Sequence, residues 1–321
     1  MSEQQAGNGG RPGLLMAGAY PEWDMQPLEA AFSVHRLWQM PDREAFLKAQ
    51  GPSIRALGTR GDLGADAALI NALPNLEIIG CYGVGTDAID LALARSRGIR
   101  VTNTPDVLTG DVADLALALI LSTMRAMPAA EAHLRSGGWS KGPMRLVNRF
   151  HGKKLGIAGF GRIGMAVARR AGGFDVEIGY FARSPKAEGA ARYFDSLVDL
   201  ARWCDVLVVT LAGGAGTKAI VDKAVLDALG PEGFFVNVSR GSTVDEAALL
   251  SALESRSIAG AGLDVFLNEP DIDPRFLALD NVSLQPHHAS GTVETRKAMG
   301  QLVRDNLAAH FAGAPLLTPV A

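Results

Sequence analysis

A glycine-rich turn, Gly159–Gly164, carries the clearest chemical signal in the chain. Its G-x-G-x-x-G pattern directly follows the apolar run Lys154–Ala158 and opens a stretch with helical periodicity. In this context glycine permits a tight turn, lets the backbone approach a pyrophosphate and allows close packing of helix on strand. The first helical turn then offers N–H groups to the phosphates. The pattern predicts a dinucleotide-binding turn rather than a glycine-rich loop without a ligand, with contacts from Gly159, Gly161, Arg162, Ile163 and Gly164.

A basic loop follows the next apolar run, Glu177–Phe181. In NAD-binding versions of this arrangement, an acidic residue about 20 residues beyond the turn binds the ribose 2′-hydroxyl. Loop 182–186 has no acidic residue and contains Arg183, Ser184 and Lys186 instead. A guanidinium can pair with a 2′-phosphate through two parallel hydrogen bonds. The loop therefore predicts NADP (NADPH) as the cofactor, with Arg183 and Ser184 as contacts; the alternative is a surface loop that accepts either cofactor.

The first half of the chain alternates short apolar runs with amphipathic stretches, which predicts βα units and a parallel sheet. The predicted strands are Leu14–Ala17, Ser33–Leu37, Ile54–Leu57, Leu76–Cys81 and Arg100–Thr102. The predicted helices are Pro41–Ala49, Ala65–Ala72 and Ile89–Arg97. Residues 1–11 are polar and glycine-rich, and we expect them to form a disordered arm.

A second series of the same kind carries the glycine turn, so we expect an α/β protein with two doubly wound parallel-sheet domains. Its predicted strands are Lys154–Ala158, Glu177–Phe181, Val206–Leu211, Phe234–Val238, Ile258–Leu263 and Val282–Leu284. Its predicted helices are Val112–Met127, Arg162–Ala171, Val225–Leu229, Glu246–Ser255 with Asp245 as cap, and the final Glu294–Phe311.

Short sequence blocks in a fixed order connect these elements. They are Gly83–Asp87, Asn103–Pro105, Thr109 with Val112–Asp114, Gly152–Ile157, Asn237–Gly241, Gly262–Phe266 with Glu269-Pro270, and Pro286-His287. Together they resemble the D-isomer-specific 2-hydroxyacid dehydrogenases from about Leu57 to the final helix. The resemblance implies a Rossmann dinucleotide-binding domain (105–287) inserted in a flavodoxin-like substrate domain (1–104 and 288–321).

The resemblance also implies a catalytic set of Arg240, Glu269 and His287. An arginine fork suits the carboxylate and carbonyl oxygen of a 2-keto acid. A histidine suits the proton donor, and a nearby carboxylate holds its ring and favours the imidazolium. His288 adjoins His287, but neighbours in an extended segment point to opposite sides, and the Pro-His order of the family selects His287.

Further contacts are implied by the same resemblance. Val84 and Gly85 are expected to offer backbone donors to the substrate carboxylate. Trp139 either lines the pocket or packs in the core. The sequence departs from the family at Leu211–Gly214, which makes cofactor contacts in 212–216 harder to assign. The remaining expected cofactor contacts are Thr109, Thr217, Val238 and Asp264, the last of them near the nicotinamide amide.

Bulk composition narrows the partners. The chain has 321 residues, a formal net charge of −3 and two cysteines far apart, Cys81 and Cys204. This predicts no nucleic-acid partner, no disulfide framework and no metal site. No apolar run approaches the roughly 18 residues of a membrane span, and the N-terminus lacks a signal-peptide pattern, so we expect a cytoplasmic protein with no membrane partner. The apolar stretch Val112–Met127 suits a homodimer contact.

The expected function is therefore NADPH-dependent reduction of a small anionic 2-keto acid, glyoxylate or hydroxypyruvate, to the D-2-hydroxy acid. Within the family the alternatives are phenylpyruvate-type substrates and 3-phosphoglycerate, although 3-phosphoglycerate enzymes often carry a further regulatory domain for which this chain ends too soon. Formate dehydrogenases lack a glutamate at the position of Glu269. A cofactor-sensing corepressor of the same family is the alternative from a different functional class.

Overall fold

The structure is a computed structural model that describes residues 10–186 and 191–320. The chain forms two compact units, Met1–Leu108 with Thr292–Ala321 (unit 1) and Thr109–Gly291 (unit 2). Unit 2 is thus inserted in unit 1. The chain passes between the units at 108/109 and 291/292, whereas the boundaries predicted from the sequence are 104/105 and 287/288. The predicted N-terminal arm lies, apart from Gly10 and Arg11, outside the described residues.

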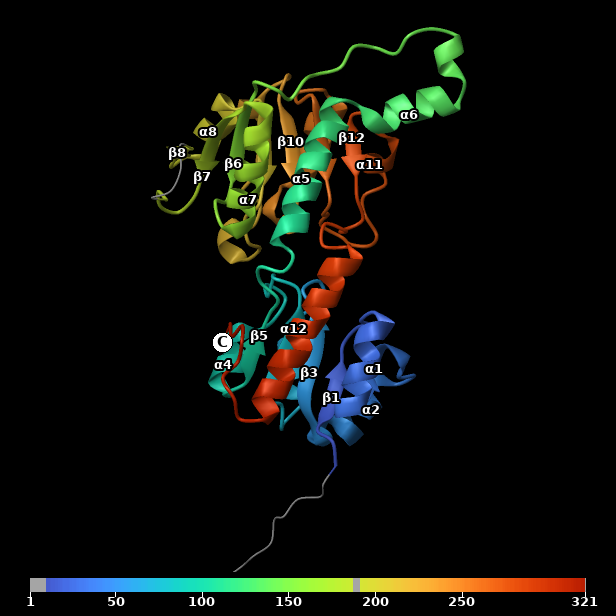
Figure 1. Cartoon of the computed structure of the whole chain (residues 1–321), viewed down its shortest axis with the longest axis vertical. Coiled ribbons are helices and arrows are strands. Elements are labelled where there is room, and N and C mark those ends of the chain that lie inside the picture. Colours follow the sequence, from blue (N-terminus) through green and yellow to red (C-terminus); the bar gives the residue numbers. More distant parts are fainter. Residues whose placement is uncertain (1–9, 187–190, 321) are drawn as a thin grey trace, which may run out of the picture. The chain divides into compact units, whose positions relative to one another are not determined.

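Unit 1 is built on a five-stranded sheet in which every pairing is parallel (Figure 1). The strand order, β2-β1-β3-β4-β5, is that of flavodoxin-like folds. The apolar runs are buried in this sheet because helices cover it, as all-parallel sheets require. The strands are β1 (Gly13–Met16), β2 (Ser33–Arg36), β3 (Ile54–Arg60), β4 (Ile78–Tyr82) and β5 (Arg100–Thr102).

The helices of unit 1 begin mostly at aspartate caps. The side chains of Asp42, Asp66 and Asp90 each accept a backbone N–H of the first helical turn. Helix α1 was not predicted: it starts without a side-chain cap and contains Pro27, and both features argue against a helix. The helices are α1 (Glu22–Ala31), α2 (Arg43–Gln50), α3 (Ala67–Asn71), α4 (Leu91–Ser96) and α12 (Val293–Phe311).

Unit 2 contains a seven-stranded parallel sheet in the order β12-β11-β10-β9-β6-β7-β8. Counted from its own first strand, β6, this is the Rossmann order with one additional strand. The edge strand β8 has only three residues and was not predicted. The strands are β6 (Lys154–Ala158), β7 (Glu177–Phe181), β8 (Arg192–Phe194), β9 (Val206–Val209), β10 (Phe234–Asn237), β11 (Gly260–Leu263) and β12 (Val282–Leu284).

The long helix predicted over Val112–Met127 is two helices. Helix α5 ends at Met124, Ala126 adopts a left-handed conformation (φ 47°), and α6 continues at a bend of 59°. Figure 1 shows α6 and the chain after it as an arm that reaches away from the sheet of unit 2. The helices are α5 (Thr109–Met124), α6 (Met127–Arg135), α7 (Arg162–Ala171), α8 (Leu197–Trp203), α9 (Lys223–Leu229), α10 (Glu246–Glu254) and α11 (Arg275–Ala278).

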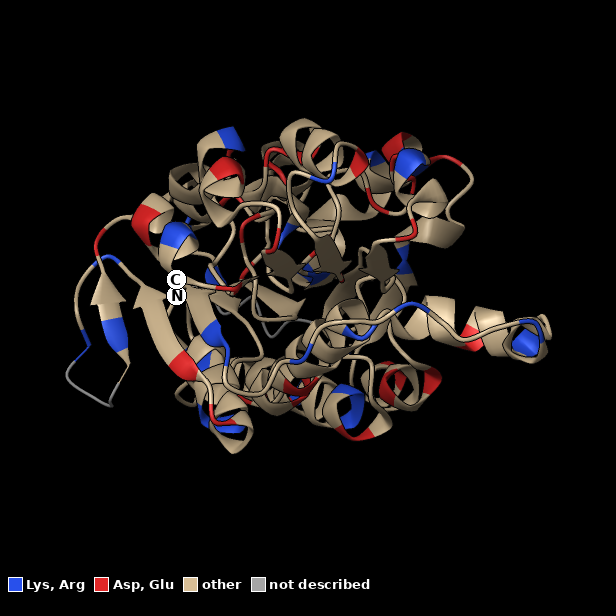
Figure 2. Cartoon of the chain, turned by 90° about the horizontal axis from the view of Figure 1, so that it is seen from above, with Lys and Arg blue, Asp and Glu red and all other residues tan. Residues whose placement is uncertain are grey.

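In the view of Figure 2, basic and acidic side chains both occur on the helices and loops that face the viewer. In the part of the chain that the structure describes, no single helix is long and apolar enough to cross a membrane; only the bent pair α5 and α6 passes that test by length and composition.

Candidate active site

The three predicted catalytic residues follow three neighbouring strands of unit 2. Arg240 comes after β10, Glu269 after β11 and His287 after β12. These strands are parallel neighbours in the sheet, so their carboxyl ends lie at one edge. Ligands of doubly wound sheets bind at that edge. The fold therefore brings the three side chains to the end of the sheet where chemistry is expected.

Glu269 and His287 form a short hydrogen bond. The Nδ1 atom of His287 lies 2.6 Å from Oε2 of Glu269, while Oε1 accepts the N–H of Phe266 at 2.8 Å. Burial raises the pKa of Glu269, but these two donors and the charges of His287 and Arg240 outweigh it, so the pKa lies below its usual value. An ionised carboxylate only accepts hydrogen bonds, so Nδ1 carries a proton and Nε2 is left for a ligand.

The backbone at His287 is held in an unusual conformation. His287 has φ +50°, in the left-handed region, and its N–H donates to the carbonyl of Asp264 at 2.7 Å. The Asp264 carboxylate accepts the N–H of His288 at 2.7 Å and of Ala289 at 3.0 Å. Asp264 is fully buried; burial raises its pKa, against these hydrogen bonds. Strained backbone of this kind persists only where its surroundings fix it, and here Asp264 does so.

The structure thus gives Asp264 a role beneath the histidine loop that sequence reasoning missed. Its expected contact with the cofactor stays a prediction. The ring of His288 lies against Gly291, where an added Cβ would meet it at 2.2 Å, and it is the ring of His287 that bonds Glu269.

Arg240 projects from a tight turn that a buried asparagine closes. Asn237 donates through Nδ2 to the carbonyl of Arg240 at 3.0 Å and accepts the N–H of Ser239 at 3.0 Å. A Cβ on Gly241 would meet the carbonyl of Phe266 at 2.0 Å, so glycine lets this turn pack directly on the loop that carries Glu269. The charge of Arg240 also lowers the pKa of Glu269. The cation and the acid–base pair are therefore electrostatically linked.

The three glycines of the turn differ in what they provide. Gly159 has φ +98°, and a Cβ there would meet the backbone of Leu211 at 2.8 Å. A Cβ on Gly164 would meet the carbonyl of Gly159 at 2.1 Å, so only glycine allows α7 to pack this closely on the turn. At Gly161, the N-cap of α7, the Cβ position faces open space and no side chain caps the helix. This is the cradle that a pyrophosphate requires.

The basic loop is fixed beside that turn. The N–H of Gly159 donates to the carbonyl of Phe181, the last residue of β7. The hydroxyl of Tyr180 accepts the N–H of Lys186 at 2.8 Å, and Tyr193 donates to the carbonyl of Ala182 at 3.3 Å. Arg183 and Ser184 lie exposed between these two anchors. The guanidinium of Arg183 has no ion-pair partner among the described residues.

Other predicted contacts fall at element ends. Thr109 begins α5, and Val238 is buried directly after β10. The hydroxyl of Thr217 donates to the carbonyl of Ala212 at 2.7 Å, so it closes the 212–217 loop in which the sequence departs from the family. Val84 and Gly85 follow β4 of unit 1.

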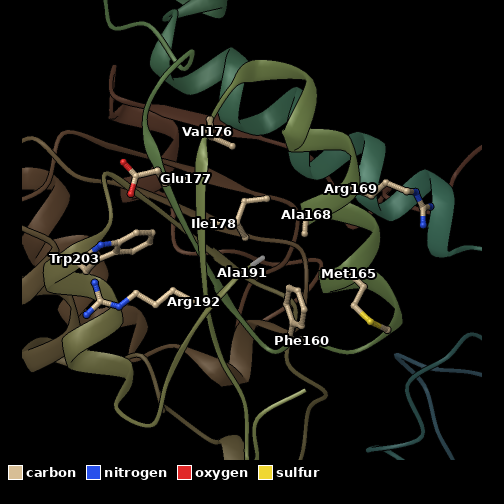
Figure 3. A pocket seen from close by; sticks show the side chains of 10 residues that line it. All are labelled: Phe160, Met165, Ala168, Arg169, Val176, Glu177, Ile178, Ala191, Arg192 and Trp203. Atoms are coloured by element: carbon tan, nitrogen blue, oxygen red, sulfur yellow. The ribbon is translucent and has the colours of Figure 1, made fainter. Parts of the chain in front are cut away.

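Two features lie apart from the catalytic set. Trp139 is 71% exposed on the arm of unit 2, so packing in the core of its own chain is excluded. A cavity of 560 Å³ lies between α7 and β7 (Figure 3). None of the predicted site residues lines it, and it adjoins the segment 187–190 that the structure does not describe, so we assign it no role. Across residues 10–186 and 191–320, no group of three or more His, Cys, Asp or Glu is placed to hold a metal ion.

The sequence was compared with known protein families and with curated proteins. Residues 117–289 match the model of the D-isomer specific 2-hydroxyacid dehydrogenase NAD-binding domain. The chain is 48% identical to hydroxyphenylpyruvate reductase of Plectranthus scutellarioides over 308 residues, which is 96% of this chain and 98% of that protein.

Two solved structures are similar over almost their whole length. A 2-hydroxyacid dehydrogenase from Ketogulonicigenium vulgare Y25 is 56% identical with a TM-score of 0.91, covering 97% of this chain and 99% of the other. An NADPH-dependent glyoxylate/hydroxypyruvate reductase from Sinorhizobium meliloti, in complex with NADP and malonate, is 44% identical with a TM-score of 0.91, covering 97% of each chain.

Proposed function

This chain belongs to the D-isomer specific 2-hydroxyacid dehydrogenases, and from that premise we propose that it reduces glyoxylate and hydroxypyruvate to their D-2-hydroxy acids with NADPH. The observation that carries the proposal is the hydrogen-bonded pair of Glu269 and His287 beside Arg240, at the carboxyl ends of neighbouring strands. Similarity to the Sinorhizobium meliloti reductase supports the choice of substrates.

We propose a role for each residue that its geometry supports. Arg240 binds the carboxylate and the carbonyl oxygen of the keto acid, because its fork presents parallel donors. His287 delivers a proton from Nε2 to the carbonyl oxygen, since Nδ1 is occupied by Glu269. Glu269 keeps the ring in place and stabilises its charge. When bound, the dihydronicotinamide supplies the hydride, and the chain's own groups supply position and field.

The cofactor would be held by the glycine turn and the basic loop. Gly161 leaves room for the pyrophosphate at the N-terminus of α7, and Arg183 with Ser184 is exposed where a ribose 2′-phosphate would need a cation. We therefore propose NADPH over NADH.

An aromatic substrate is the second candidate. The similarity to a hydroxyphenylpyruvate reductase favours it, because that name indicates a bulky substrate. A steady-state panel of glyoxylate, hydroxypyruvate, pyruvate and hydroxyphenylpyruvate, each with NADPH and with NADH, decides between them. We expect the highest kcat/KM for glyoxylate or hydroxypyruvate with NADPH. A kcat/KM for hydroxyphenylpyruvate about tenfold above both would select the aromatic reaction, and no turnover of any keto acid would favour a cofactor-sensing binding protein.

We also propose a homodimer. The arm of unit 2 exposes Met127, Leu134, Trp139 and Leu146, of which Leu146 is 98% exposed. Large apolar side chains exposed on one arm are unfavourable in water, and a second copy of the chain would cover them.

A further inference from the structure

The loop after β4 is held by unusually regular hydrogen bonds. Three consecutive carbonyls each accept one donor: Gly83 accepts the N–H of Thr104 at 2.9 Å, and Val84 accepts Nδ2 of Asn103 at 2.8 Å. Gly85 accepts the thiol of Cys81 at 3.4 Å. All of these residues belong to unit 1.

These contacts determine where the loop N–H groups point. In a trans peptide the carbonyl of one residue and the N–H of the next lie in one plane and point in opposite directions. Thr104 therefore turns the N–H of Val84 away from the 103–104 segment, and Asn103 does the same for the N–H of Gly85. Neither N–H donates to an acceptor within the described residues. Two adjacent N–H groups that point to the same side can together bind an anion.

Asn103 is itself held from its other side by the C-terminal segment. The hydroxyl of Thr318 donates to the carbonyl of Asn103 at 2.6 Å. Thr318 in turn is fixed by Asn306, a fully buried residue of α12. Nδ2 of Asn306 donates to the threonine hydroxyl at 2.9 Å, and its Oδ1 accepts the N–H of Thr318 at 3.1 Å. A hydrogen-bonded chain thus runs from α12 through Thr318 and Asn103 to Val84.

We infer that Asn103 is a positioning residue for substrate binding, which fixes the Val84–Gly85 amides as donors to the carboxylate of the keto acid, and that Thr318 supports it. The inference rests on the proposed function. A carboxylate remains unchanged through hydride transfer, so its donors contribute equally to ground-state and transition-state binding. Loss of Asn103 should therefore raise KM for the keto acid and leave kcat nearly unchanged.

The test compares Asn103→Ala with a matched control, Asn75→Ala. Asn75 also lies in unit 1 and also donates through Nδ2 to a backbone carbonyl, that of Pro52, at 2.8 Å. The readouts are KM and kcat for glyoxylate, KM for NADPH, and Ki for oxamate, which carries the carboxylate but is not reduced. In Asn103→Ala we expect KM for glyoxylate and Ki for oxamate to rise about 3- to 10-fold together, the worth of one hydrogen bond.

In Asn103→Ala we expect kcat and KM for NADPH to stay within about twofold of wild type. The variant loses only an interaction that binds the keto acid equally in the ground state and the transition state. Asn75→Ala should match wild type throughout. Thr318→Val, which removes only the supporting hydroxyl, should raise the same two constants by a smaller factor.

Unchanged KM for glyoxylate and Ki for oxamate in Asn103→Ala, whether or not kcat and thermal stability fall, would overturn the inference and leave the proposed function standing. A wild type that turns over no 2-keto acid would refute the proposed function, and the inference with it.

Discussion

Both carboxylate oxygens of Glu269 are occupied: Oε2 lies 2.6 Å from Nδ1 of His287, and Oε1 accepts the N–H of Phe266. The Glu269 carboxylate therefore holds the ring of His287 in one orientation, and the N–H of Phe266 holds the carboxylate. Nε2 has no hydrogen-bond partner in the described part of the chain, and the side chain is 35% exposed, so this nitrogen is accessible to a ligand.

Glu269→Gln should change the pH dependence of stability. Burial raises the pKa of Glu269, but its donors and the nearby cations bring it below the usual value. A depressed folded pKa stabilises the folded protein above the unfolded pKa, and that contribution is lost as pH falls through the folded pKa. The difference in unfolding free energy between wild type and variant should be largest near neutral pH. It should decrease as pH falls below about 4.3, the usual glutamate pKa, and through the lower pKa of the folded state. Urea denaturation at a series of pH values on both sides of that range measures it.

The control for that experiment is Glu232→Gln, which alters an exposed glutamate of the same unit. A difference between wild type and Glu269→Gln that stays constant with pH would show that the carboxylate is not stabilised by its partners.

Arg183→Ala should lose affinity for one cofactor only. A charge-assisted hydrogen bond contributes roughly 1.5–3 kcal/mol, so kcat/KM for NADPH should fall about 10- to 100-fold while that for NADH changes little. Arg202→Ala removes an exposed arginine of the same unit that pairs with Asp199, and it should leave both values unchanged. A wild type that prefers NADH, or a variant that loses both cofactors equally, would show that Arg183 does not bind the 2′-phosphate.

Asp264→Asn should affect both stability and turnover. The amide would present a donor to one of the N–H groups of His288 and Ala289 that the carboxylate now accepts. We expect the unfolding free energy to fall by about 1.5–3 kcal/mol and kcat to fall with it, because the His287 loop loses its anchor. If Asp264 acted only on the cofactor, KM for NADPH would rise and chemical denaturation would be unchanged.

Replacing two arm residues should disrupt the proposed dimer. Trp139 and Leu146 are 71% and 98% exposed. In the double variant Trp139→Ser, Leu146→Ser, sedimentation velocity should show a monomer where the wild type shows a dimer, because the apolar contact is removed. A wild type that sediments as a monomer, or a variant with an unchanged mass, would exclude this arm as the interface.

Much of the fold could be predicted from the sequence, because buried parallel strands appear as continuous apolar runs. The strands β5, β6, β7 and β12 were predicted with the bounds that the structure shows, and the other strands except β8 within a few residues. The break between α5 and α6 could not be predicted, because alanine has a high helix propensity. Only the folded chain shows that Ala126 adopts a left-handed backbone conformation. Strand β8 is short and lies at a sheet edge, so its three residues carry no periodic signal.

The catalytic residues of the site could be predicted from the sequence, but the residues that hold the site loops could not. Arg240, Glu269 and His287 were named from their sequence blocks, and the parallel strand order explains why residues 18 and more positions apart meet. The groups that hold the site loops were missed. Asp264 holds the loop after His287, and Asn103 holds the Val84–Gly85 loop, each through backbone groups 20 or so positions away. Only the folded chain shows those partners.

The acid–base role of His287 can be tested with the adjacent histidine as its control. In His287→Ala, kcat for keto-acid reduction should fall about 10²- to 10⁴-fold, the usual contribution of general acid catalysis, while NADPH binding measured by fluorescence stays intact. His288→Ala should keep near-normal turnover, since that ring does not bond Glu269. Near-normal turnover in His287→Ala, or an equal loss in both variants, would contradict the assignment.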